Sequence, residues 1–91
     1  MNGIKKLRKC LEEKPLHQSS TILAKLIIAL ENKEHFYLAD LYELDYDTFA
    51  IAIEVMEDWR LDRYYASRMK LLDYVLHGLP VQGINVELYN N

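Results

Sequence analysis

Residues 20–32 read STILAKLIIALEN, and this stretch decides the fold because it carries the strongest helical pattern in the chain. Its apolar side chains recur every three or four residues, as on one face of a helix: Ile22, Leu23, Leu26, Ile27 and Leu30. Ser19 or Ser20 can cap this helix, because a serine oxygen accepts hydrogen bonds from the free N–H groups of the first turn. Ile28 lies outside the apolar face. A helix that is apolar on more than one side is central or at an interface, so we predict the core helix here, with Ile28 as a contact to a second subunit.

Two shorter helical patterns flank this core helix. Residues 3–13 are amphipathic, with Ile4, Leu7 and Leu11 on one face, and Pro15 stops the helix because proline disfavours helical geometry in the residue before it. Residues 36–44 predict a short helical turn whose leucines point inward: Leu38, Leu41 and Leu44.

Two longer amphipathic patterns follow, at 47–61 and 63–77. In the first, Glu54, Glu57 and Asp58 lie on the side opposite the apolar face. At about 100° per residue, the apolar face shifts by roughly 180° between the two halves. The phase therefore predicts two helices, with a break near Leu61-Asp62 and Asp62 as a cap. Gly78 in a left-handed conformation, followed by Pro80, ends the second helix.

The C-terminal residues have a different pattern. Over residues 84–89, Ile84, Val86 and Leu88 alternate with polar or half-polar residues, which is the period of a strand. A lone strand leaves its backbone groups unpaired. Three arrangements meet this need: an extended tail on the helices, pairing with the same tail of a second chain, or local pairing with His35–Leu38.

These patterns together predict a mainly α fold, a small bundle of four to five helices with an extended or single-strand C-terminal tail. The chain has 91 residues, enough for one domain and too few for two. We predict a single domain over 1–91, with its core at about 4–79 and the tail at 80–91.

Composition limits the classes of protein to consider. One cysteine, Cys10, excludes an internal disulfide and a cysteine-rich zinc site. The longest uncharged apolar run, Leu26–Leu30, is far shorter than the roughly 20 residues of a membrane span. We therefore expect a cytoplasmic protein and no membrane association.

Charge is distributed unevenly along the chain. Residues 1–14 carry five basic and two acidic side chains, a net charge of +3, and residues 31–62 carry two basic and ten acidic ones, a net charge of −8. This arrangement favours an N-terminal helix folded back on the acidic middle, or electrostatic steering of a partner.

No pattern with catalytic or cofactor chemistry is present. The histidines, His17, His35 and His77, are far apart and follow no metal-ligand spacing. The acidic residues between Asp40 and Asp47 are better explained as helix caps, and the three glycines form no phosphate-binding loop. We expect neither enzymatic activity nor a cofactor nor a metal.

The most distinctive stretch is Trp59–Lys70, where arginines alternate with aromatic residues. Such a mixture suits protein interfaces and stacking on nucleic-acid bases, although local ion pairing, for instance between Glu57 and Arg60, also explains it. Together with Ile28 and the tail, the predicted interaction surface comprises Ile28, Arg60, Arg63, Tyr64, Ser67, Arg68, Lys70, Ile84, Val86 and Leu88.

The sequence thus predicts a small intracellular protein-interaction or structural module without catalytic activity. A homodimer is one form that such a module can take. The alternative is a nucleic-acid-binding protein, for which a net charge of −3 is unfavourable. Its contacts would be Lys5, Lys6, Arg8, Lys9, Arg60, Arg63, Arg68 and Lys70.

Overall fold

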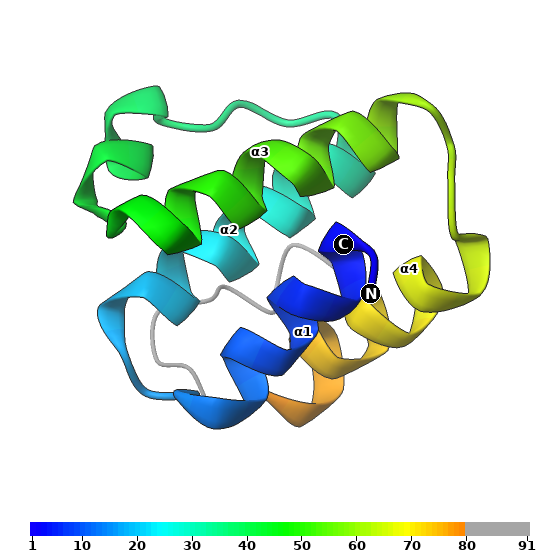
Figure 1. Cartoon of the computed structure of the whole chain (residues 1–91), viewed down its shortest axis with the longest axis horizontal. Coiled ribbons are helices and arrows are strands. Elements are labelled where there is room, and N and C mark those ends of the chain that lie inside the picture. The colour runs from blue at the N-terminus through cyan, green and yellow to red at the C-terminus, as the bar shows by residue number, and fades with distance from the viewer. Residues whose placement is uncertain (80–91) are drawn as a thin grey trace.

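The computed structural model describes residues 1–79 and confirms a small helical bundle (Figure 1). Four α-helices, a 3-10 helix (η1) and a π-helical turn (η2) follow one another, and the described residues contain no strand: α1 (Gly3–Glu13), α2 (Gln18–Asn32), η1 (Leu38–Glu43), α3 (Tyr46–Arg60), α4 (Tyr65–Asp73) and η2 (Tyr74–Gly78). The predictions for Ile84, Val86 and Leu88 lie outside the described residues. The predicted strand partner, His35–Leu38, enters η1 without forming a strand.

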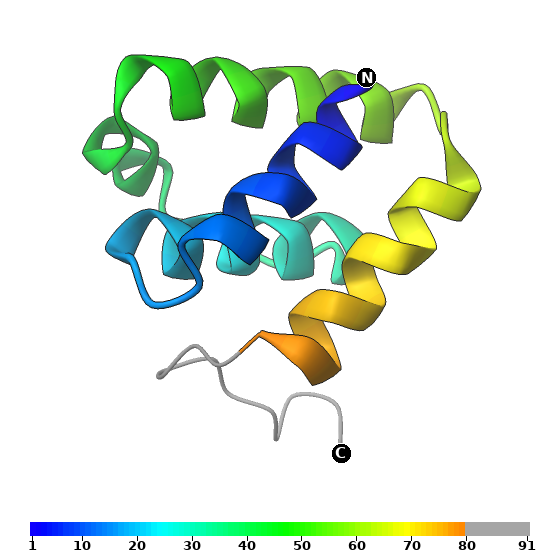
Figure 2. The ribbon, with the colours of Figure 1, turned by 60° about the horizontal axis from the view of Figure 1, so that its bottom comes forward.

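Helix α1 is the element that joins the others. It contacts α2, α3 and α4, and Figure 2 shows it running obliquely across α2 and α3, with α4 at one end of the bundle. Ile4, Leu7 and Leu11 are fully buried, as the amphipathic pattern predicts. At its start α1 approaches α3 so closely that a Cβ added to Gly3 would lie 2.8 Å from Cγ of Glu54.

Helix α2 is the core helix, as predicted, and Leu23 and Ile27 have no exposed surface. Ile28 is only 5% exposed and belongs to the same hydrophobic core. The prediction that Ile28 contacts a second subunit is therefore corrected, because the helix is surrounded widely enough to bury residues beyond one face.

The start of α2 also differs from the prediction. His17, one residue before the helix, accepts a hydrogen bond through Nδ1 from the backbone N–H of Ser19 at 3.1 Å. Ser20 instead lies inside the first turn, where it is 1% exposed and donates its hydroxyl proton to the carbonyl oxygen of Lys14 at 2.6 Å. This bond ties the end of α1 to the start of α2.

Replacing Ser20 by alanine is expected to lower the free energy of unfolding by about 0.5–1.5 kcal/mol, because the side-chain hydrogen bond is lost, while the Lys14 carbonyl keeps its hydrogen bond from the His17 backbone N–H. Urea denaturation followed by circular dichroism measures this change. Gln18→Ala, at an exposed position in the same turn, is the control and should leave stability nearly unchanged. Equal stabilities for the two variants would contradict the role given to Ser20.

The predicted break between the last two helices is confirmed. Helix α3 ends at Arg60 and α4 begins at Tyr65, and the linker contains two residues in the left-handed conformation, Asp62 (φ 53°) and Tyr64 (φ 59°). Asp62 does not cap α4, because Tyr64 holds the capping position and makes no side-chain cap. The Asp62 carboxylate accepts a hydrogen bond from Nη1 of Arg68 at 2.7 Å instead.

Two further details correct the sequence predictions. Leu41 and Leu44 are buried, but Leu38, at the first position of η1, is 66% exposed. Gly78 is needed for space and not for a left-handed conformation: a Cβ there would lie 2.8 Å from the ring of Tyr74.

Candidate functional site

Within Trp59–Lys70, the structure leaves most of the predicted interaction residues exposed but turns one of them, Arg68, inward. Arg60, Arg63, Tyr64 and Lys70 are exposed and Ser67 is half-buried. Arg68 turns inward: its side chain is 14% exposed, and its guanidinium carbon lies 5.2 Å from the ring centroid of Trp59 and 5.7 Å from that of Tyr65. Arg68 therefore joins α3 to α4 and is not part of an open surface.

The basic N-terminal helix lies partly against the acidic middle of the chain. Nζ of Lys6 forms an ion pair with Glu54 of α3 at 3.1 Å, as the charge pattern suggested, while Lys5 and Lys9 remain exposed. The charges of α1 are therefore turned only in part toward acidic residues.

Sequence reasoning missed a group of exposed apolar side chains on η1 and the start of α3. We call it the aromatic–acidic surface, and its apolar members are 66–86% exposed: Tyr37, Leu38, Tyr42 and Tyr46. Tyr42 stacks on Phe49 of α3, with ring centroids 6.3 Å apart. Single exposed apolar residues are ordinary, but four of them within residues 37–46 indicate a segment that a partner can cover.

Carboxylates accompany these rings along the same segment. Asp40 and Glu43 belong to η1, and Asp45 and Asp47 stand at the start of α3. Of these four carboxylates, only that of Asp45 caps a helix. It accepts a hydrogen bond from the backbone N–H of Thr48 at 2.7 Å, as predicted for Asp45 or Asp47.

That hydrogen bond from the Thr48 backbone, with a second from the Thr48 side chain, holds the pKa of Asp45 below its usual value. Since the pKa is lower in the folded chain than in the unfolded one, the cap stabilises the fold above the unfolded pKa. Its contribution is lost as pH falls through the folded pKa.

Thermal unfolding between pH 6 and pH 2 tests this linkage. Asp45→Asn keeps a capping oxygen but does not titrate, so its midpoint is expected to fall less steeply below about pH 4 than that of the wild type. Asp47→Asn, an exposed carboxylate two residues further on that does not cap α3, is the control and should keep the wild-type slope. Parallel curves for the wild type and Asp45→Asn would contradict the prediction.

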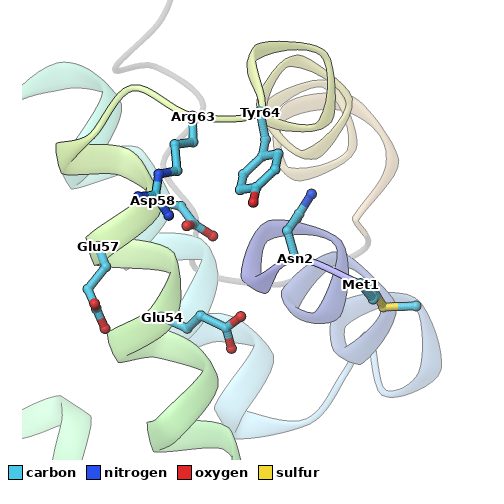
Figure 3. Close-up of a pocket in the computed structure, with 7 residues that line it drawn as sticks. All are labelled: Met1, Asn2, Glu54, Glu57, Asp58, Arg63 and Tyr64. Atoms are coloured by element: carbon cyan, nitrogen blue, oxygen red, sulfur yellow. The ribbon is translucent and has the colours of Figure 1, made fainter.

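A cavity of about 400 Å³ lies where the second half of α3 meets the starts of α1 and α4. Figure 3 shows its walls, which are formed by Met1, Asn2, Glu54, Glu57, Asp58, Arg63 and Tyr64. Asp58 was expected on the side opposite the apolar face, but it is 6% exposed. The α3–α4 linker folds back on it, and the Arg63 backbone N–H donates to the Asp58 carbonyl oxygen at 3.0 Å.

A smaller cavity of about 130 Å³ brings together Cys10, His17 and Asp45. Burial raises the pKa of the Cys10 thiol, and the nearby Glu13 carboxylate adds to this effect. A raised pKa keeps the sulfur protonated, whereas nucleophilic cysteines have lowered pKa values. Within residues 1–79, histidine, cysteine and acidic side chains nowhere form a group of three that could hold a metal ion.

Residues 1–79 thus form a small helical bundle, in which an aromatic segment is exposed at η1 and the start of α3 and a polar cavity lies beside Asp58. Comparison with protein-family models, curated proteins and solved structures gives no match. None of the helices within residues 1–79 combines the length and apolar character that crossing a membrane requires.

Proposed function

We propose that this chain is a protein-interaction module without catalytic activity, which binds a basic segment of a partner protein through the aromatic–acidic surface. The observation that carries the proposal is the exposure of Tyr37, Leu38, Tyr42 and Tyr46, at 66–86%, on one short segment. The proposal includes a cytoplasmic location, for which a free cysteine is suited.

The chemistry of the surface defines the partner. Tyrosine gives a large contact area and keeps a polar hydroxyl, so it suits both the exposed free state and a buried bound state. Four carboxylates on the same segment, those of Asp40, Glu43, Asp45 and Asp47, attract a positive partner and repel a negative one. Arginine fits best, because its guanidinium group pairs with carboxylates and stacks on aromatic rings.

Selection from a library of random peptides tests the proposal. Peptides that bind the wild-type protein should be rich in arginine and should carry at least one large apolar residue. Tyr46→Ser, at a position that is 86% exposed, is expected to weaken their binding at least tenfold. The measurement is fluorescence anisotropy of labelled peptides.

Leu61→Ser is the matched control, since Leu61 is 55% exposed at the opposite end of α3, and it should not change binding. Acidic selected peptides, or equal binding to the wild type and Tyr46→Ser, would refute the proposal. Sedimentation velocity shows whether a second copy of the chain binds this surface. If the wild type is a dimer and Tyr46→Ser is a monomer, the chain self-associates through this surface instead of binding a basic segment.

Nucleic-acid binding is the alternative, and two of its predicted contacts are already engaged. Lys6 pairs with Glu54, and Arg68 pairs with Asp62 while its guanidinium lies over the Trp59 ring. The test is binding to duplex DNA and single-stranded RNA at low salt. Affinity that falls steeply with salt concentration would support this alternative, and an absence of binding at low salt would eliminate it.

A further inference from the structure

We propose that the cavity around Asp58 is a binding site for an organic cation, an ammonium or guanidinium group. The inference is independent of the aromatic–acidic surface, which lies on η1 and the start of α3, whereas Asp58 stands near the end of α3. It rests on a buried side-chain oxygen of Asp58, for which the described part of the chain supplies no hydrogen-bond partner.

The Asp58 side chain is the key group. The residue is 6% exposed, and its Oδ2 atom is buried and accepts no hydrogen bond from residues 1–79. Neither of the two ion pairs found among these residues includes Asp58. A buried carboxylate without a partner is costly, so a ligand that supplies N–H donors and a positive charge gains the free energy that the folded chain has not recovered.

The cavity gives such a ligand access to this group. Figure 3 shows the Asp58 carboxylate directed into the space between α3 and the side chains of Asn2 and Tyr64. Its volume of about 400 Å³ lies within the range of small-molecule sites. The Asn2 side-chain oxygen caps α1 by accepting from the Lys5 backbone N–H at 2.8 Å, so the acceptors that remain for a cation are the carboxylates of the walls.

The charges of the walls favour a cation over an anion. Three carboxylates line the cavity against two basic groups, the guanidinium of Arg63 and the α-amino group of Met1. Glu54 is already paired with Lys6, while Glu57 is exposed at the rim. An organic cation also fits better than a metal ion, because these side chains form no group able to hold one.

Tyr64 completes the site with an aromatic wall. It is 46% exposed and adopts a left-handed conformation with φ 59°, which is unfavourable for a bulky residue. This conformation sets the ring over the cavity (Figure 3). An aromatic face beside carboxylates is the combination that attracts guanidinium and ammonium groups.

Titration with methylguanidinium and ethylammonium chlorides, at constant ionic strength, tests the proposal on the full chain. We expect saturable shifts in the ¹⁵N–¹H spectrum at the amides of Asn2, Asp58 and Arg63. Tetramethylammonium, a cation without N–H donors, should produce at least tenfold weaker effects. Shifts that never saturate, or that are equal for all three cations, would overturn the proposal.

Variants locate the site. Asp58→Asn is expected to weaken binding of methylguanidinium at least tenfold, whereas Asp73→Asn, the same change at an exposed position in α4, should have no effect. Since Asp58 is buried, Glu57→Gln at the rim provides a second test that does not endanger the fold. The affinity for methylguanidinium is expected to fall threefold or more.

Arg63→Gln, which removes a positive charge from the wall, should bind methylguanidinium at least as tightly as the wild type. Unchanged binding in both Asp58→Asn and Glu57→Gln, or loss of binding in Arg63→Gln, contradicts the assignment.

The cation belongs either to a protein side chain or to a free small molecule, and a blocked tripeptide with a central arginine distinguishes these two sources. Tighter binding of the tripeptide than of methylguanidinium identifies a protein side chain as the ligand, and equal or weaker binding identifies a free small molecule. Tyr46→Ser should leave both affinities unchanged, so a failure of the proposed function and a failure of this site are seen separately.

Discussion

Replacement of Leu23 by alanine is expected to lower the free energy of unfolding by about 2–5 kcal/mol. Leu23 lies in α2 and has no exposed surface, and its neighbours in the core come from several other elements. Truncation removes the transfer free energy of the lost methyl and methylene groups and leaves a cavity that a well-packed interior fills only in part. Denaturation in urea measures the effect.

The size of the loss matters because a small domain has little stability to spare, about 5–15 kcal/mol in total. Leu61→Ala is the control, since Leu61 is 55% exposed, and its effect should stay within about 0.5 kcal/mol. Ile28→Ala extends the test to the residue that the sequence placed at an interface. A negligible effect at Leu23 or Ile28 would mean that α2 is not the centre of the fold.

The second large effect is expected at Arg68, whose replacement by alanine should cost about 2 kcal/mol. Its guanidinium lies over the rings of Trp59 and Tyr65, and each such contact is worth about 0.5–2 kcal/mol. The ion pair with Asp62 adds little, because the Asp62 side chain is 80% exposed and water screens the charge. Nε of Arg68 is buried without an acceptor, which offsets part of the gain.

Trp59 is the only tryptophan in the chain, so its fluorescence reports on this contact directly. Arg68→Ala should change the emission of the folded protein as well as the unfolding midpoint. Arg68→Lys keeps the charge but loses the planar group that stacks on aromatic rings, and an intermediate stability is expected. Arg60→Ala, at an exposed position, is the control. If Arg60→Ala and Arg68→Ala unfold at the same urea concentration, the α3–α4 contact is not stabilising.

The helices could be predicted from the sequence because their apolar residues have a clear period. The expected helix at 3–13 is α1 without change, and the break near Leu61-Asp62 followed from the phase of two apolar faces. The ends of helices were predicted less well. His17 takes the cap expected of Ser19 or Ser20, because hydrogen bonding between neighbouring elements decides which polar residue is free to cap.

The candidate sites could not be predicted in the same way, because they depend on how elements pack. Period alone places Asp58 opposite an apolar face, but the linker after α3 folds back and buries it. Arg68 belongs to an arginine-rich stretch that looks exposed in sequence, yet Trp59 and Tyr65 draw its guanidinium inward. Leu38 has the spacing of an inward residue, but its position at the first turn of η1 leaves it outside the core.

The central place of α1 has a consequence for the synthesis of the chain. Helix α1 is synthesised before α3 and α4, which it contacts, and the Lys6–Glu54 pair joins residues 48 positions apart. Contacts between distant residues slow folding, because a long loop must close before they form. The apolar face of α1, with Ile4, Leu7 and Leu11, is therefore fully covered only after α4 has emerged, and nascent chains that stop before α3 should recruit chaperones that bind exposed apolar segments.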